Sequence, residues 1–470
     1  MEDVIVIGSG LAGLSTAMEL VDMGRRPTIL ERHNVVGGRT ADWVADGMKV
    51  ESGLHRWLGF YKALPELFEK AGLDPDDAVI WEDEVEIRLP DGGPQAVMGL
   101  APLHRPLQTV AGLLGNNDLI SPSEKAAITY FFSTGLVDFA ATRRELDHNS
   151  VYDYARKRGV SEEAITNLLV PLTEGIFFLP PERYSAMVLM GLLVPALKRP
   201  HTIRVGAFAG GMTEVMSAPI AAAIGRRGGS VQTEMPVERL AVENGRVRGV
   251  YVHGERIEAN HVVVATSLAS AQALIRDALG DHPWFGKMLS LPSMPAVTLQ
   301  IELTEPSLPE DHVVFSPKTV LASYAEQSRT TFRHVPGRLS IDMGQPEKFI
   351  NEPPEVIFEA AMRDAQRLGL NVANNVVRYR VVSHPSDFYL LAPGMEELRP
   401  PQATPVDGLT LAGDYTAQAL FCSMEGAVMS GQRAAEAVAL ALKGGNGKVS
   451  SADLRAEQAP AYESPAAAEK

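Results

Sequence analysis

Cysteine, long apolar runs and an excess of basic residues are all missing from this sequence. Cys422 is the single cysteine, so no intrachain disulfide can form, which fits a reducing compartment. The formal net charge of −15 argues against a nucleic-acid partner and against electrostatic adsorption to anionic lipid. The longest apolar run, residues 186–197, has 12 residues including Pro195, which is too short to span a bilayer.

Signatures of several enzyme classes are also missing. The 11 histidines are scattered without metal-ligand spacing, so we expect no bound metal. Neither a GxSxG elbow nor a phosphate-binding P-loop is present. The chain starts with an apolar strand pattern and no basic leader region, which favours a cytoplasmic protein. Its 470 residues are too many for one simple core, so two or three joined domains are expected.

The start of the chain carries a dinucleotide-binding pattern. VIVIGSGLAGLSTAMELVDMGRRPTILERHNVVGG predicts a buried strand, a glycine turn, an amphipathic helix and a second strand. Gly8, Gly10 and Gly13 form GxGxxG, which serves a tight turn, close approach of backbone to a pyrophosphate, and close packing of helix on strand. Glu31 ends the second strand, where its carboxylate can hold ribose hydroxyls and disfavours a 2′-phosphate.

The residues that follow favour FAD over a nicotinamide cofactor. Gly37, Gly38 and Arg39 offer a second close backbone approach and a guanidinium, which suit a second contact with a diphosphate. The stretch KVESGLHRWLGFY predicts a strand and a turn that directs His55 toward the flavin. A nicotinamide-binding domain would instead continue with another helix and strand.

Later segments are expected to return to the same site. Residues 207–266 predict a helix, a hairpin over Glu243-Asn244-Gly245, and an apolar strand that ends at Ala265 and rejoins the dinucleotide sheet. GLTLAGDYT predicts one more apolar strand, which delivers Asp414 as an acceptor for ribityl hydroxyls. N–H groups of the helix expected after it would face the flavin N1/C2=O edge and stabilise the reduced form.

These stretches together resemble the FAD-dependent amine oxidase and carotenoid desaturase superfamily, most closely the plant- and cyanobacterial-type phytoene and zeta-carotene desaturases. The resemblance covers residues 3–440, and its most specific stretch is LAGDYTAQALFCSMEGAVMSGQRAAEAV. It is also carried by VIVIGSGLAGLSTA, LERHNVVGGRTADW, ESGLHRWLGFY, LAPLHRPLQTVAGLLGNNDLISPSEKAAI and LRPPQATPVDGL. It implies noncovalent FAD, hydride transfer from a C–H bond to flavin N5, and quinone or its rival oxygen as electron acceptor.

The fold implied by this resemblance is α/β, with a Rossmann-type FAD-binding domain and a second, substrate domain of mixed sheet plus helical cap. The expected segments are FAD-binding parts at 1–90, 206–275 and 401–443, a cap at 91–205, substrate sheet and helix at 276–400, and a polar tail at 444–470. The composition of the tail is typical of disorder.

The resemblance also implies site residues. We expect His55 and Tyr389 to orient the substrate, while the flavin carries the chemistry and no protein side chain is catalytic in its own right. The expected cofactor contacts come from the glycine turns, the acid and the closing segment: Gly8, Ser9, Gly10, Leu11, Ala12, Gly13, Glu31, Arg32, Gly38, Arg39, Leu54, His55, Val237, Ala265, Gly413, Asp414 and Met424.

The middle of the chain is expected to be helical and apolar. The run Ser121–Glu124 predicts a capping box with proline in the first turn, and we expect breaks at Pro171, Pro180–Pro181 and Pro195. Its aromatic and methionine side chains fit either a long apolar tunnel or ordinary helix core. In the family this cap often dips into one leaflet, so contact with the inner membrane would be peripheral and would depend on hydrophobic insertion.

Three functions stay open. One is dehydrogenation of an apolar isoprenoid such as a carotene precursor, and hydroxysqualene dehydroxylases share the same outline. Another is oxidation of a more polar amine, which is disfavoured because Thr298 stands near the place where many amine oxidases carry a lysine. A third is a flavin-binding scaffold without turnover. Arg56, Trp57 and Asp387 depart from the desaturase pattern and add polarity near the expected cavity mouth.

Overall fold

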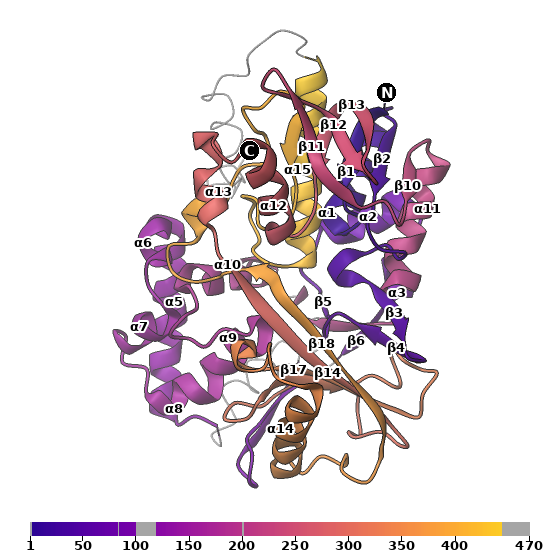
Figure 1. Cartoon of the computed structure of the whole chain (residues 1–470). Helices are drawn as coiled ribbons and strands as arrows, with labels where there is room; N and C mark the ends of the chain where they lie inside the picture. Colours follow the sequence, from indigo (N-terminus) through magenta and orange to yellow (C-terminus); the bar gives the residue numbers. More distant parts are fainter. Residues whose placement is uncertain (1, 83, 100–118, 200–201, 444–470) are drawn as a thin grey trace.

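The structure of the chain is a computed structural model that describes residues 2–82, 84–99, 119–199 and 202–443. One sheet with α1 and α15 forms one half, and a second sheet with α14 forms the other (Figure 1). The expected tail and the start of the stretch LAPLHRPLQTVAGLLGNNDL lie outside the described residues. No helix in the described parts is both long enough and apolar enough to cross a membrane.

The centre of the first sheet is built from the buried apolar strands that the sequence predicted. Its parallel part has the order β10-β2-β1-β13-β19. These strands are β10 (Ser230–Gln232), β2 (Pro27–Leu30), β1 (Glu2–Ile7), β13 (Glu255–Val264) and β19 (Leu409–Leu411). Strands from three distant parts of the chain therefore meet side by side, which confirms the return of both later segments into the dinucleotide sheet.

Two helices that cover this sheet lie very close to each other. The helices α1 (Leu11–Asp22) and α15 (Met424–Lys443) pack against each other, and the Ser15 hydroxyl donates to the Val428 carbonyl at 2.9 Å. A Cβ at Gly431 would lie 2.4 Å from the Ala12 carbonyl oxygen. The contact thus depends on a missing side chain, and it joins the first helix of the chain to the last described one.

An antiparallel hairpin extends the sheet beyond β13. It consists of β11 (Val237–Glu243) and β12 (Arg246–Val252), with Asn244 and Gly245 both at positive φ. This pair of left-handed residues is what a two-residue hairpin turn needs, so the predicted hairpin is confirmed.

The second sheet alternates between a helix-facing and a cavity-facing side. On β14, Val297, Leu299 and Ile301 pack in one apolar core with Ile357 of α14 (Pro354–Arg367), while the intervening residues face the other way. The strand order of the second sheet is β18 (Val376–Tyr389), β14 (Ser293–Leu303), β17 (Gly337–Met343), β16 (Leu321–Glu326), β15 (Val314–Phe315), β7 (Glu84–Arg88) and β8 (Gln95–Gly99).

Helices between residues 122 and 198 gather beside the second sheet, and they are called the cap helices below (Figure 1). The longest of them, α5 (Pro122–Ala141), begins with the predicted capping box, because Ser121 and Glu124 each accept a backbone N–H of the other. The other cap helices are α6 (Arg143–Asp147), α7 (Val151–Arg156), α8 (Glu162–Ala164), α9 (Val170–Phe177) and α10 (Ala186–Lys198).

Two of the predicted helix breaks are wrong. The chain stays helical through Pro171, because a π-helical segment, Ile165–Leu169, precedes α9 and leaves the proline in the first turn of that helix. Pro195 lies inside α10, which continues to Lys198. Pro195 has no N–H to donate to the Gly191 carbonyl, and the helix continues for three residues without that bond. The break at Pro180–Pro181 is confirmed, since it separates α9 from α10.

Smaller elements connect the two sheets. The turn predicted after KVE lies between β4 and β5. The remaining strands and helices are β3 (Asp42–Ala45), β4 (Met48–Glu51), β5 (Trp57–Leu58), β6 (Val79–Glu82), β9 (Val205–Phe208), α2 (Ala63–Ala71), α3 (Pro75–Ala78), α11 (Ala218–Arg226), α12 (Leu268–Leu279) and α13 (Gly286–Ser290).

Candidate active site

A cavity of about 2110 Å³ runs from the carboxyl ends of the parallel strands to the cap helices. Its lining comes from the glycine turns, from the second sheet, and from α5, α9 and α10. A crevice outside the carboxyl ends of parallel strands is where doubly wound sheets bind their ligands.

The three glycines of the first turn have different surroundings. A Cβ at Gly13 would lie 2.0 Å from the Gly8 carbonyl oxygen, so this position serves packing. Gly8 has a φ of +99°, which favours glycine by itself. A Cβ at Gly10 would meet no protein atom within 4 Å, because Gly10 borders the cavity. The space above Gly10 is therefore open to a ligand that touches backbone.

The first turn of α1 faces the same space without a side-chain cap. Gly10 is the N-cap residue and offers no side-chain acceptor, while Leu11 and Ala12 line the cavity. Free N–H groups at the N-terminus of a 12-residue helix attract an anionic group such as a pyrophosphate.

The carboxylate of Glu31 lies beside this turn. It accepts the Ser9 amide at 2.9 Å, the Ser9 hydroxyl at 2.7 Å and the His33 amide at 2.9 Å. A carboxylate has about four acceptor positions, so one more remains for a ligand hydroxyl. Glu31 is buried and borders the cavity, which puts this last position on the cavity side.

The second glycine pair, Gly37 and Gly38, packs directly against the first glycine turn. Gly37 and Gly10 form a parallel bridge, and the Gly37 amide donates to the Ser9 carbonyl at 3.0 Å. A Cβ at Gly38 would approach the Gly10 Cα to 3.1 Å. Arg39 follows this contact and reaches the Asp414 carboxylate.

Arg39 forms an ion pair with Asp414, whose two oxygens differ. The guanidinium lies 2.7 Å from Oδ1, while Oδ2 is buried without a hydrogen-bond partner. Burial alone would lower the pKa of Arg39, but Asp414, Cys422 and Asp387 together raise it. A buried acceptor without a partner is costly unless a ligand donates to it, so Oδ2 fits a ligand hydroxyl.

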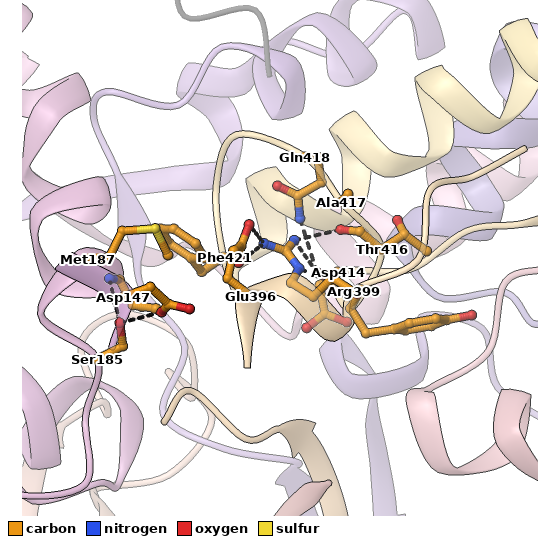
Figure 2. Close-up of polar contacts among 12 residues, drawn as sticks. Asp147, Ser185, Met187, Glu396, Arg399, Asp414, Thr416, Ala417, Gln418 and Phe421 are labelled. Atoms are coloured by element: carbon orange, nitrogen blue, oxygen red, sulfur yellow. Dashed lines mark hydrogen bonds and ion pairs between the residues drawn. The ribbon is translucent and has the colours of Figure 1, made fainter. Parts of the chain in front are cut away.

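The loop that carries Asp414 is held from behind by Arg399 (Figure 2). This fully buried guanidinium donates to the carbonyls of Asp414 at 3.0 Å and Thr416 at 2.5 Å, and it pairs with Glu396 at 2.8 Å. The helix α15 begins at Met424, so the residues between Asp414 and Met424 form a loop rather than the first turns of a helix.

Most residues expected at the cofactor line the cavity, and three expected site residues do not. Ser9 and Gly13 lie just behind it, where Ser9 binds Glu31 and Gly13 packs on Gly8. Tyr389 is buried beside Arg399, whose Cζ lies 5.0 Å from its ring centre. The expected cofactor contacts that do line the cavity are Gly8, Gly10, Leu11, Ala12, Glu31, Arg32, Gly38, Arg39, Leu54, His55, Val237, Ala265, Gly413, Asp414 and Met424.

His55 sits on the turn between β4 and β5. Its Nδ1 lies 3.0 Å from the Gly53 carbonyl oxygen, and burial lowers its pKa to about 4. The imidazole is therefore neutral at neutral pH. Its neighbour Arg56 pairs with Glu82 at 2.5 Å, so the charge that departs from the desaturase pattern is balanced within the wall of the cavity.

Residues 11–439 match the family model described as flavin containing amine oxidoreductase. The chain belongs to this family. It is accordingly an enzyme of the FAD-dependent oxidoreductases, and the mixed α/β architecture is that of two-domain flavin amine oxidases.

Relatives of this flavin oxidoreductase are distant. The chain is 28% identical over 454 residues to a 15-cis-phytoene desaturase of Synechococcus elongatus, covering 93% of this chain and 95% of the relative. It is 27% identical over 482 residues to a zeta-carotene desaturase of Synechocystis, covering 93% and 96%. At this distance the comparison gives the family and leaves the substrate open.

Solved structures agree on the fold. An oxidoreductase from Methanosarcina mazei superposes with a TM-score of 0.71 at 18% identity, covering 92% of this chain and 100% of that one. A redesigned putrescine oxidase superposes with a TM-score of 0.70 at 19% identity, covering 93% and 98%.

FAD fits the residues present in this flavin oxidoreductase. The open space at Gly10, the uncapped α1 and the unpartnered Asp414 Oδ2 provide room, anion-binding N–H groups and a hydroxyl acceptor. When bound, FAD supplies the two-electron acceptor for a hydride. The residues around it would bind and orient the ligands and exclude water.

Several lining residues were not found by sequence reasoning. Asp342, Ser323 and His384 come from β17, β16 and β18, and no motif marks them. Burial raises the pKa of Asp342 to about 7, against hydrogen bonds from the Leu54 amide and the Ser323 hydroxyl. Asp387 also lines the cavity, and burial raises its pKa despite the nearby Arg39.

One group of possible metal ligands lies away from this cavity's cofactor end. Glu84, Glu310 and His312 have ligand atoms within 4.8 Å of one another. His312 Nε2 already lies 3.2 Å from Glu86 Oε2, and Glu310 is exposed. We therefore assign no metal to this group.

Proposed function

We propose that this flavin oxidoreductase removes a hydride from a C–H bond of an apolar isoprenoid and passes it to noncovalently bound FAD. The observation that carries the proposal is the continuity of the cavity from the glycine turns to an apolar wall under the cap. Phe132, Leu136, Leu172, Ile176 and Leu192 form part of that wall. The relatives named as desaturases of 15-cis-phytoene and zeta-carotene support this substrate class.

The proposed cofactor contacts are the lining residues given above, with Ser9 and Gly13 supporting them from behind. Noncovalent binding is favoured because Cys422 is buried, its Sγ lies 3.8 Å from Arg39, and burial raises the pKa of the thiol. A protonated thiol is a weak nucleophile toward a flavin. Quinone or oxygen would then reoxidise the enzyme.

Peripheral contact with a membrane is part of the proposal. Tyr130 and Val137 are exposed on α5, and Leu197 is exposed on α10. Both helices also line the cavity, so an apolar substrate could enter from a lipid phase between them. The division into three FAD-binding segments, a cap and a substrate sheet is proposed with the boundaries expected from the sequence.

The alternatives differ in what they need from the cavity. An amine oxidase is disfavoured because Thr298 lines the cavity where many such oxidases carry a lysine, and because the far wall is apolar. A hydroxysqualene dehydroxylase-like reaction would use the same apolar wall, so it remains the second candidate.

The test is anaerobic mixing of the purified holoprotein with candidate substrates in detergent micelles, followed through flavin absorbance. Phytoene or zeta-carotene should bleach the flavin and yield a more conjugated polyene. Bleaching by putrescine alone would contradict the proposal. Squalene formed from hydroxysqualene by the pre-reduced enzyme would favour the dehydroxylase reaction. No flavin change with any of these compounds would leave a scaffold without turnover.

A further inference from the structure

A single transverse row of side chains forms the floor of the cavity. In the strand registers, Thr298 of β14 lies opposite Asp342 of β17, which lies opposite Ser323 of β16. Ser323 lies opposite Phe315 of β15, and Phe315 lies beside Ile87 of β7. All five line the cavity. Directly paired residues share a face of the sheet, so the row is continuous across five strands.

The row is polar at one end. Thr298 is only 2% exposed, and its hydroxyl has no hydrogen-bond partner. Asp342 Oδ1 accepts the Leu54 amide at 3.3 Å, and Oδ2 accepts the Ser323 hydroxyl at 3.3 Å. Both bonds are long, and each carboxylate oxygen keeps acceptor capacity. A buried hydroxyl without a partner beside a carboxylate with spare acceptor positions points to a ligand group that both donates and accepts.

This polar end lies at the turn expected to face the flavin. A Cβ at Gly53 would lie 3.5 Å from His55 Cε1, 3.8 Å from Thr298 Cγ2 and 3.9 Å from Asp342 Oδ1. The turn and the row are thus in contact, and a ligand group on Thr298 and Asp342 would sit next to the residues proposed to hold the cofactor.

The other end of the row is apolar and lies under the cap. Phe315 and Ile87 continue the floor, and α9 packs on Phe315 so closely that a Cβ at Gly175 would lie 2.5 Å from the ring. A ligand along this row would therefore meet hydrogen-bonding groups at the cofactor end and hydrocarbon at the other.

We infer that the row binds a long-chain isoprenoid alcohol, with its hydroxyl on Thr298 and Asp342 and its hydrocarbon over Phe315 and Ile87. This rests on the proposed function and narrows its substrate class. An alcohol donates to the carboxylate and accepts from the threonine, whereas a pure hydrocarbon leaves the Thr298 hydroxyl unpaired and the spare acceptor positions of Asp342 unfilled. That difference corresponds to roughly 10-fold or more in affinity.

The experiment measures binding to the oxidised holoprotein under anaerobic conditions, by perturbation of the flavin spectrum and by thermal shift. The ligands are geranylgeraniol, its methyl ether, and the C20 hydrocarbon with the same double bonds. The alcohol should bind roughly 10-fold tighter than the hydrocarbon, with the ether in between because it accepts but cannot donate. Thr298→Val and Asp342→Asn should each bring this ratio toward one.

Phe315→Ala is the matched control, because it should weaken the alcohol and the hydrocarbon by the same factor. Equal binding of alcohol and hydrocarbon by the wild type would overturn the inference and leave the proposed function standing. A ratio unchanged in Thr298→Val, which keeps shape and removes only the hydroxyl, would also overturn it. If no ligand binds while flavin is retained, the proposed function falls as well.

Discussion

Residues of the same type do different work in the glycine turn. Gly13 has no room for a methyl group, because the Gly8 carbonyl occupies that position. Gly10 has open cavity above it and an ordinary extended conformation, with φ −66° and ψ 172°. Fold and ligand binding are therefore separable at two positions three residues apart.

Gly10→Val should abolish flavin retention and leave the stability of the flavin-free protein nearly unchanged, because the new side chain fills ligand space only. Gly13→Ala should instead lower the free energy of unfolding by about 1–3 kcal/mol through overpacking. Flavin absorbance after gel filtration and urea unfolding of the flavin-free proteins measure the two effects. Normal flavin content in Gly10→Val would contradict the assignment of this space.

Glu31→Gln should weaken FAD binding by roughly 10- to 100-fold, since a charge-assisted hydrogen bond is worth about 1.5–3 kcal/mol. Equilibrium dialysis gives the affinity. Glu31→Ala should behave differently, because it also removes the acceptor of the Ser9 hydroxyl and the Ser9 and His33 amides. The glutamine amide keeps one acceptor oxygen and turns an NH2 group toward the remaining donor, so both variants should unfold at lower urea concentration than the wild type, the alanine variant at the lowest. Equal flavin affinity in wild type and Glu31→Gln would show that the carboxylate does not reach the ligand.

Asp342 should make the protein less stable as the pH rises. Burial raises its pKa to about 7 in the folded state, with Arg56 opposing and Asp387 adding to the shift, against 3.8 for the ordinary group. The folded state then binds more protons than the unfolded state between about pH 4 and 7, so stability falls across this window. Asp342→Asn should remove part of that fall.

Urea unfolding of wild type and Asp342→Asn between pH 5 and 8 measures this effect, and the variant should gain on the wild type toward pH 7. Asp91→Asn is the control. Asp91 is exposed, and its hydrogen bond with Arg367 lowers its pKa, so any contribution lies below this window. A constant difference between Asp342→Asn and wild type would contradict a raised pKa.

At the scale of elements, local patterns predicted local structure well. The strand-turn-helix at the start, the Asn244-Gly245 hairpin and the capping box at Ser121 all depend on residues a few positions apart. The row through Thr298, Asp342 and Ser323 was beyond such reasoning, because it depends on the register of strands far apart in sequence. The predicted helix breaks at Pro171 and Pro195 were wrong for a related reason, because packing and a π-helical segment override the local preference of proline to end a helix.

The loop between Asp414 and Met424, which Arg399 contacts, provides a prediction at this scale. Arg399→Lys loses the planar fork that reaches the carbonyls of Asp414 and Thr416, so it should cost about 3 kcal/mol in unfolding free energy and speed flavin release. Arg433→Lys is the matched control, because Arg433 has one contact of 3.2 Å with the Ala417 carbonyl and is only half-buried. Its effect should stay below about 1 kcal/mol. Equal effects of the two changes would contradict a special role for Arg399.

In the whole molecule, segments that are far apart in sequence meet at one end of the cavity. The turn at Gly10, the bridge at Gly37 and the loop at Asp414 surround the same end of the cavity. FAD bound there should stabilise both sheets of the fold together, because the cavity walls come from both.

Adding FAD at 100 times its dissociation constant should raise the free energy of unfolding by about 2.7 kcal/mol. Thermal unfolding of the flavin-free protein at rising FAD concentration measures it. ADP is the control, since it can occupy only the nucleotide end and should shift the midpoint less. A thermal unfolding midpoint that does not change with FAD concentration would contradict the assigned site.

The parallel contact of β13 with both β1 and β19 also sets an order of events during synthesis. On the ribosome, β1 (Glu2–Ile7) is made long before β19 (Leu409–Leu411). At about 5–20 residues per second this delay is on the order of 20–80 s. Through that interval the apolar edge of the nascent sheet lacks its last strand and α1 lacks α15. Until synthesis has passed Leu411, the edge of β13 that pairs with β19 is therefore open to pairing with another chain.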